Sequence, residues 1–301
     1  MNSLAVVLVL SSCAIHAGWN LLAKNSSKTP AFFLIGYLVL AAALTPAFLA
    51  LGGARMAAAP AGMWICLLLS GVFLTAYFAC LAAAYRHGDV SVAYPLIRTT
   101  PVFVLLLAGL VLKQHPTWPA VLGVGLAVAG CFLLQFRKLG LGPEACDWRV
   151  FLSRTSLWAL AAALASSGYT LADDVGMDLI SRVAPGARGA FFYNYLEFVA
   201  VAAGLLAVAL YFDRPAGVMR VWRAEKLNAV AVGAMIFGAY LLILWAYLNA
   251  DKVAYVAGLR QLSIVLGVLG GIAFFGEPGG KVRLTASIVI VAGLILIALA
   301  R

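Results

Sequence analysis

The sequence predicts an all-α polytopic membrane protein in which ten transmembrane helices form two inverted five-helix repeats. Hydrophobic residues make up 64% of the 301 residues and charged residues only 11%, which leaves too little polar sequence to cover a soluble core. Apolar runs of about 20 residues, the length that spans a bilayer, recur throughout the chain. In addition, a stretch of the first half returns in the second.

The apolar runs place the spans in order along the chain. They lie near residues 3–22, 31–51, 62–85, 90–112, 118–136, 154–174, 190–212, 227–249, 253–275 and 283–300. The longest polar break, residues 137–154, follows the fifth span. We therefore predict a first repeat over residues 1–140 and a second over residues 150–301.

The internal repeat is clearest where residues 85–116 are compared with residues 247–278. An offset of 162 residues superposes Asp89 on Asp251 and Arg98 on Arg260, and rare residue types do not coincide readily in so apolar a chain. Because each repeat has an odd number of spans, the second enters the membrane in the opposite sense. Inverted repeats are typical of alternating-access carriers.

The net charge of +10 is explained by short basic loops between spans, so no nucleic-acid partner is expected. Most of these loop charges lie on the side opposite both termini, and the positive-inside rule alone would place the termini outside. The five cysteines form no CxxC pair, so no metal site or disulfide framework is predicted. No cofactor motif and no catalytic cluster is found, and we do not expect an enzyme.

Two arginines, Arg98 and Arg260, fall inside predicted spans. A charge in hydrocarbon costs roughly 2.5–3.5 kcal/mol on insertion scales, so each needs a cavity, a partner or a substrate. One hypothesis is that protein carboxylates neutralise them. The other is that they line a central cavity and bind an anionic group, with Tyr94 one turn before Arg98 and Gln261 next to Arg260.

The first span carries a polar and aromatic stripe. His16, Trp19 and Asn20 share one helix face, which cannot favourably face lipid. His16 is either a hydrogen-bonded structural residue or a protonatable residue of a cavity. The sixth span has a matching set in Tyr169 and Thr170.

Acidic residues inside spans are candidates for proton coupling. Glu197 lies deepest in apolar sequence, and it is either the counter-ion of an arginine or a proton carrier. Asp173 and Asp174 lie near the end of the sixth span. With His16, these three residues complete the set of proton-coupling candidates.

Several motifs together resemble the EamA-type branch of the drug/metabolite transporter superfamily. They are the run from His16 to Asn20, the Gly88–Asp89 start of the fourth span, the run from Leu259 to Ser263, and Gly276–Pro278. The resemblance implies a bacterial inner-membrane carrier, with the ten-helix basket of the YddG-type aromatic amino acid exporters. It also implies cytoplasmic termini, against the distribution of loop charges.

Together these features predict a monomeric secondary transporter in the inner membrane. It would export a small polar or zwitterionic metabolite, amino acid-like or aromatic, with protons as coupling ions and the lipid bilayer as its surroundings. A phosphonate or an amine is the alternative substrate. The alternative function is a non-transporting scaffold or lipid-handling subunit, which would need no cavity around the arginines.

Overall fold

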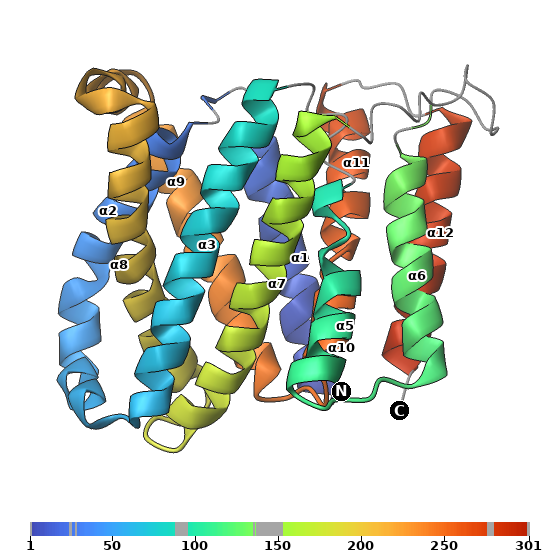
Figure 1. Ribbon diagram of the computed structural model, residues 1–301, viewed down its shortest axis with the longest axis horizontal. Coiled ribbons are helices and arrows are strands. Elements are labelled where there is room, and N and C mark those ends of the chain that lie inside the picture. Colours follow the sequence, from blue (N-terminus) through green and yellow to red (C-terminus); the bar gives the residue numbers. More distant parts are fainter. Residues whose placement is uncertain are drawn as a thin grey trace.

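The computed structural model describes residues 2–23, 26–27, 29–87, 96–134, 136, 153–275 and 280–299. Every regular element in these ranges is a helix (Figure 1). In chain order they are α1 (Ser3–Leu22), α2 (Pro30–Ala50), the 3-10 helix η2 (Gly53–Ala58), α3 (Ala61–His87), α5 (Thr100–Val111), α6 (Trp118–Leu133), α7 (Arg154–Ser181), α8 (Gly186–Phe212), α9 (Arg214–Tyr247), α10 (Val253–Leu259), α11 (Leu262–Phe275) and α12 (Lys281–Leu299).

Within the described ranges, seven helical segments are long and apolar enough to cross a membrane. They are α1, α2, α3, α8, α9, the α10–α11 segment and α12. The apolar helices α5 and α6 are shorter, with 12 and 16 residues. Helix α7 has 28 residues, and its Ser, Thr and Asp residues make it more polar. The prediction of an all-α, multi-pass membrane protein is confirmed, whereas the count of ten spans stays a prediction.

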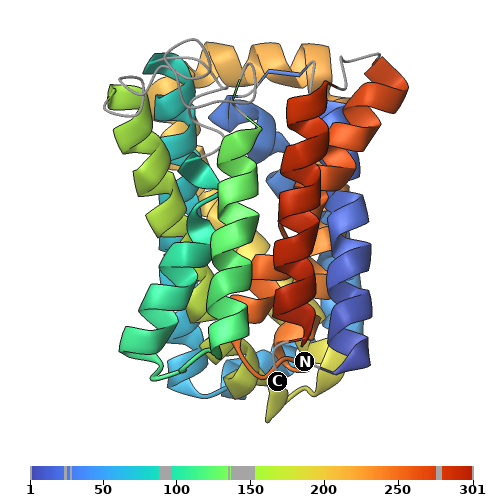
Figure 2. The same cartoon turned by 90° about the vertical axis from the view of Figure 1, so that its right-hand side faces the viewer.

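The helices stand side by side, and both termini lie at the same end of the bundle (Figure 1). Helix α1 runs away from that end and α7 runs towards it. Helices α6 and α12 lie next to each other and run in opposite directions (Figure 2).

The contacts between the first and the second half of the chain come in matching pairs. Helix α1 packs against α9 as α7 packs against α3, and α2 packs against α9 as α8 packs against α3. Likewise, α1 contacts α11 as α7 contacts α5. These three pairs of contacts correspond when the halves of the chain are exchanged.

Glycines allow the closest helix crossings. A Cβ atom built on Gly36 of α2 would lie 2.6 Å from the carbonyl oxygen of Ala229, beside Gly233 of α9. A Cβ atom on Gly123 of α6 would lie 2.6 Å from the carbonyl oxygen of Gly293 of α12. In lipid, where apolar burial does not drive helices together, such backbone contact supplies much of the packing energy.

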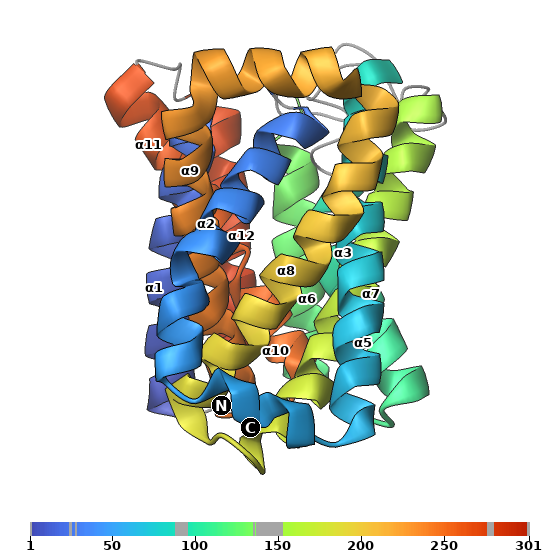
Figure 3. The same ribbon diagram turned by 90° about the vertical axis from the view of Figure 1, so that its left-hand side faces the viewer.

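Helix α9 begins earlier than the predicted span 227–249. Its first turns lie across the end of the bundle away from the termini (Figure 3) and expose Arg220 and Arg223. The Asp213 carboxylate accepts a hydrogen bond from the Ala31 amide at 2.8 Å, and the Glu225 carboxylate accepts one from the Ser27 amide at 2.9 Å. These contacts fix the basic segment over the start of α2.

Two predicted spans are interrupted by a turn at an arginine. The span 253–275 is divided into α10 and α11 by a turn at Arg260 and Gln261, and the span 90–112 has a turn at Arg98 and Thr99 before α5. Pro101 lies in the first turn of α5, where the missing amide hydrogen costs no helical hydrogen bond. The sixth span also differs, because α7 continues beyond residue 174 to Ser181.

Candidate functional site

The two intramembrane arginines occupy the two helix breaks. Arg98 and Arg260 each open a two-residue turn, and the 162-residue offset of the sequence repeat relates one turn to the other. The Gln261 side chain donates a hydrogen bond to the main-chain oxygen of Arg98 at 3.3 Å. Ser263 donates one to the main-chain oxygen of Arg260 at 2.8 Å. Polar side chains thus bond carbonyl oxygens at the breaks, as buried backbone requires.

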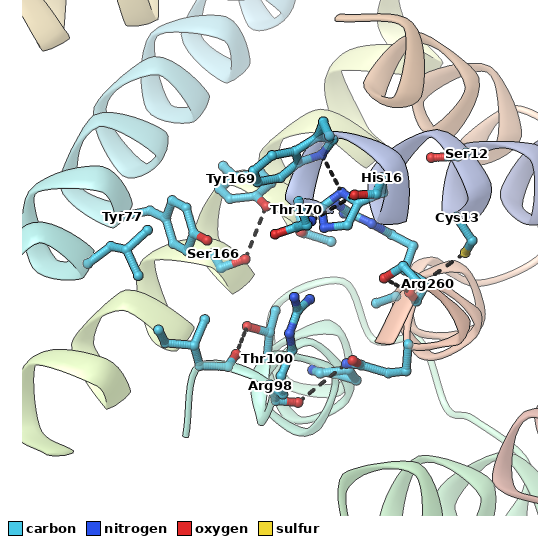
Figure 4. Close-up of a pocket in the computed structure, with 18 of the residues that line it drawn as sticks. Ser12, Cys13, His16, Tyr77, Arg98, Thr100, Ser166, Tyr169, Thr170 and Arg260 are labelled. Atoms are coloured by element: carbon cyan, nitrogen blue, oxygen red, sulfur yellow. Dashed lines mark hydrogen bonds between the residues drawn. The ribbon is translucent and has the colours of Figure 1, made fainter. Parts of the chain in front are cut away.

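Residues of both breaks line a single cavity of about 250 Å³. Eight of the nine residues predicted to bind substrate line it: His16, Trp19, Asn20, Arg98, Tyr169, Thr170, Arg260 and Gln261. The ninth, Tyr94, lies outside the described residues, as do the motif residues Gly88, Asp89 and Gly276–Pro278. The close-up shows Arg98 extending from its turn towards Thr170 and His16 (Figure 4).

Arg260 meets an aromatic ring. Its guanidinium carbon lies 5.7 Å from the centre of the Tyr240 ring, a cation–π contact. Within the described ranges, no carboxylate lies at ion-pair distance from Arg260. The hypothesis that a protein carboxylate neutralises this arginine therefore finds no support in the geometry.

The polar stripe of α1 faces the cavity. The Trp19 indole nitrogen donates a hydrogen bond to Nδ1 of His16 at 3.2 Å, with the rings edge to face at 4.9 Å. Because Nδ1 accepts this bond, His16 is neutral in this arrangement and carries its proton on Nε2. The Asn20 amide donates to the main-chain oxygen of His16 at 2.7 Å, near the end of the helix.

The cavity wall from α7 is hydroxyl-rich and aromatic. The Ser166 hydroxyl donates to the Tyr169 hydroxyl at 3.1 Å. Tyr77 of α3 contacts Tyr169 edge to face, with the ring centres 6.3 Å apart. The sequence reasoning missed Tyr77, Phe33 and Cys13 as cavity residues. An aromatic hydroxyl in the middle of an otherwise apolar span was the signal for Tyr77, but nothing distinguished Phe33 or Cys13.

The three acidic candidates have different surroundings. Glu197 lines a smaller cavity of about 90 Å³, which shares His16, Tyr169 and Arg260 with the main one. Asp173 is fully buried and lines neither cavity. Asp174 instead accepts a hydrogen bond at 3.3 Å from Gln114, in the connection between α5 and α6. Over the described ranges, no three metal-ligating side chains gather at one point.

The fold and site define a class of protein: a multi-pass membrane protein with a cationic, partly aromatic cavity enclosed by its helices. Residues 3–136 match the EamA-like transporter family. This match supports a relationship to the drug/metabolite transporter superfamily. No curated protein sequence matches significantly.

A solved structure described as the crystal structure of a protein has a similar fold. The TM-score is 0.73 at 17% identity, and the alignment covers 98% of this chain and 96% of that one. At this identity the likeness concerns the fold alone.

Proposed function

We propose that the protein is a secondary transporter that exports a small metabolite bearing a carboxylate, zwitterionic or amino acid-like, by alternating access between two inverted repeats. The observation that carries the proposal is the pair of arginines at two related helix breaks around one cavity. Broken helices at a central site expose backbone groups and leave hinges, as alternating-access carriers need. The proposed location is the inner membrane, and the proposed state is a monomer.

The cavity lining favours a substrate with a negative group and an apolar or aromatic body. Arg98 and Arg260 provide the cations, while Trp19, Tyr77 and Tyr169 provide aromatic faces. A volume of about 250 Å³ falls just below the roughly 300–1,000 Å³ of pockets for drug-sized ligands. The size suits a single amino acid better than a larger drug, and the two cations disfavour an amine.

The proposal is tested by transport in proteoliposomes. Radiolabelled amino acids, a phosphonate and an amine are offered to the parent protein and to the Arg98→Ala and Arg260→Ala variants. Each variant should lose about tenfold or more in the rate for a carboxylate substrate, because a charge-assisted hydrogen bond contributes about 1.5–3 kcal/mol. Arg182→Ala is the matched control, since Arg182 is exposed and pairs with Asp178 on the surface.

Equal transport by the parent and both cavity variants would reject the site. An absence of transport by the parent for every compound would favour the scaffold or lipid-handling alternative. Thermal unfolding of each variant in detergent separates a lost binding group from a lost fold.

A further inference from the structure

A second polar site lies beside the cavity, where α3, α7, α8 and α9 meet. Asp173 of α7 and Glu197 of α8 are both 0% exposed. The Ser70 hydroxyl of α3 donates a hydrogen bond to Oε1 of Glu197 at 2.8 Å and lies next to Asp173. The Tyr240 hydroxyl of α9 donates to Oδ2 of Asp173. Two buried carboxyls therefore surround one serine.

Donors are too few for two carboxylates. A carboxylate pair offers about eight lone-pair positions, whereas Ser70 and Tyr240 supply one hydrogen each. Oδ1 of Asp173 and Oε2 of Glu197 have no hydrogen-bond partner among the described residues. Neither carboxyl forms an ion pair within the same ranges. Two adjacent buried negative charges without an ion-paired cation are strongly unfavourable, which favours a bound proton.

A third buried polar group also faces this position. Tyr193 of α8 is 0% exposed, and its hydroxyl lies next to the Asp173 carboxyl and near Glu197. Gly176 makes room for it, because a Cβ atom there would lie 2.5 Å from the Tyr193 hydroxyl oxygen. Even with the Tyr193 hydroxyl as a third donor, only three hydrogens face about eight lone-pair positions, so the pair stays short of donors.

The groups that face the pair include one permanent cation. Among the described residues of the surrounding helices they are His16, Tyr37, Cys66, Tyr77, Tyr169, Tyr193, Tyr240, Tyr247 and Arg260. Tyrosine and cysteine are neutral at neutral pH in water, and His16 accepts a hydrogen bond at Nδ1. The charge on Arg260 is therefore the one that opposes protonation of the pair.

Tyr240 connects this pair to the substrate cavity. Its hydroxyl bonds Asp173, while its ring lies 5.7 Å from the Arg260 guanidinium carbon. Glu197 and Arg260 also line the same small cavity. Tyr240 thus contacts both Asp173 and Arg260, and a change of charge at Arg260 changes the electrostatic potential at the two carboxyls.

We propose that Asp173 and Glu197 together bind one exchangeable proton, and that neutralising Arg260 makes this proton bind more tightly. The second part rests on the proposed function, in which the substrate's anionic group neutralises Arg260. Anion and proton then favour each other's binding reciprocally. Efflux of the substrate down its own gradient would carry a proton in the same direction.

The test needs no substrate. Infrared difference spectroscopy of the purified full chain in lipid follows the carbonyl stretch of protonated carboxyl groups as pH is raised. The parent should show a buried carboxyl band at neutral pH. The band should be lost or shifted in both Asp173→Asn and Glu197→Gln, but unchanged in Asp178→Asn, which removes an exposed acid of α7. Arg260→Gln imitates the neutralised arginine and should retain the band to a pH about one unit higher, equivalent to a tenfold change in proton affinity.

Each part of the inference has an outcome that overturns it. A band that neither acid substitution alters would refute the proton-binding pair. An unchanged titration in Arg260→Gln would refute the link to the cavity. Ser70→Ala keeps both acids and should shift the band, so the pair remains testable if the acid variants misfold. Failure of transport in proteoliposomes would leave these spectra unaffected, and so the two proposals fail separately.

Discussion

The Gln261 side chain, only 4% exposed, donates its hydrogen bond to the main-chain oxygen of Arg98. The second residue of one helix break therefore holds the backbone of the other. Each half of the chain contributes one of these breaks, and the bond lies directly at the contact between them.

Replacing Gln261 by Leu should remove this bond and keep most of the volume. We expect a loss of about 1 kcal/mol in stability, the usual value for one hydrogen bond, and a larger proportional loss of transport. Thr45→Val is the control, because Thr45 bonds Tyr195 at 2.9 Å away from the cavity. Both variants should unfold at similarly lowered temperatures, and equal transport by both would contradict a role for the Gln261 contact.

Two glycines of α6 provide a matched pair for testing the helix crossing. Gly123→Ala places a methyl group 2.6 Å from the Gly293 oxygen, whereas nothing lies within 4 Å of a Cβ atom on Gly125. Gly123→Ala should cost about 1–3 kcal/mol through overpacking. Gly125→Ala should be neutral or stabilising by up to about 1 kcal/mol, since alanine favours helix. Thermal unfolding in detergent measures both, and the reverse order would show that α6 and α12 do not cross there.

The Trp19–His16 hydrogen bond should affect the protonation of the cavity. Trp19→Phe retains an aromatic ring and removes the indole donor, so Nδ1 of His16 is free to take a proton. We expect a change in the pH profile of transport and a rate reduced by about tenfold at most. Trp118→Phe changes an indole that is 79% exposed and should leave the profile as it is. Matching profiles for both variants would assign Trp19 a packing role only.

The basic start of α9 should interact with anionic lipid. Arg220 and Arg223 are exposed on the turns of α9 that lie across the end of the bundle (Figure 3). Each basic residue near an anionic surface contributes about 1 kcal/mol. In nanodiscs, anionic lipid should raise the unfolding temperature of the parent more than that of Arg220→Gln/Arg223→Gln. Arg182→Gln removes a charge that is already paired with Asp178 and should respond to anionic lipid as the parent does.

Much of the helical arrangement could be predicted because the bilayer imposes a simple rule, an apolar run of fixed length. Arg98 and Arg260 were identifiable since a charge in such a run is costly. The break at Arg260 was not expected, because no proline accompanies it and composition does not report where a helix is interrupted. The placement of Asp173 beside Glu197 could not be predicted either, since it depends on which faces of α7 and α8 meet.

The sequence also could not distinguish Asp173 from Asp174. Adjacent helix positions point about a quarter-turn apart or more, so one acid is enclosed with Tyr240 while its neighbour reaches Gln114. Only the rotation of α7 about its own axis decides between them.

The two interrupted helices have a mechanical consequence. The two turns touch each other, so α5, α10 and α11 can tilt separately while the glycine crossings of α6 with α12 and of α2 with α9 stay closely packed. In the proposed alternating-access cycle these short segments would serve as the hinges, so that no whole helix would have to slide.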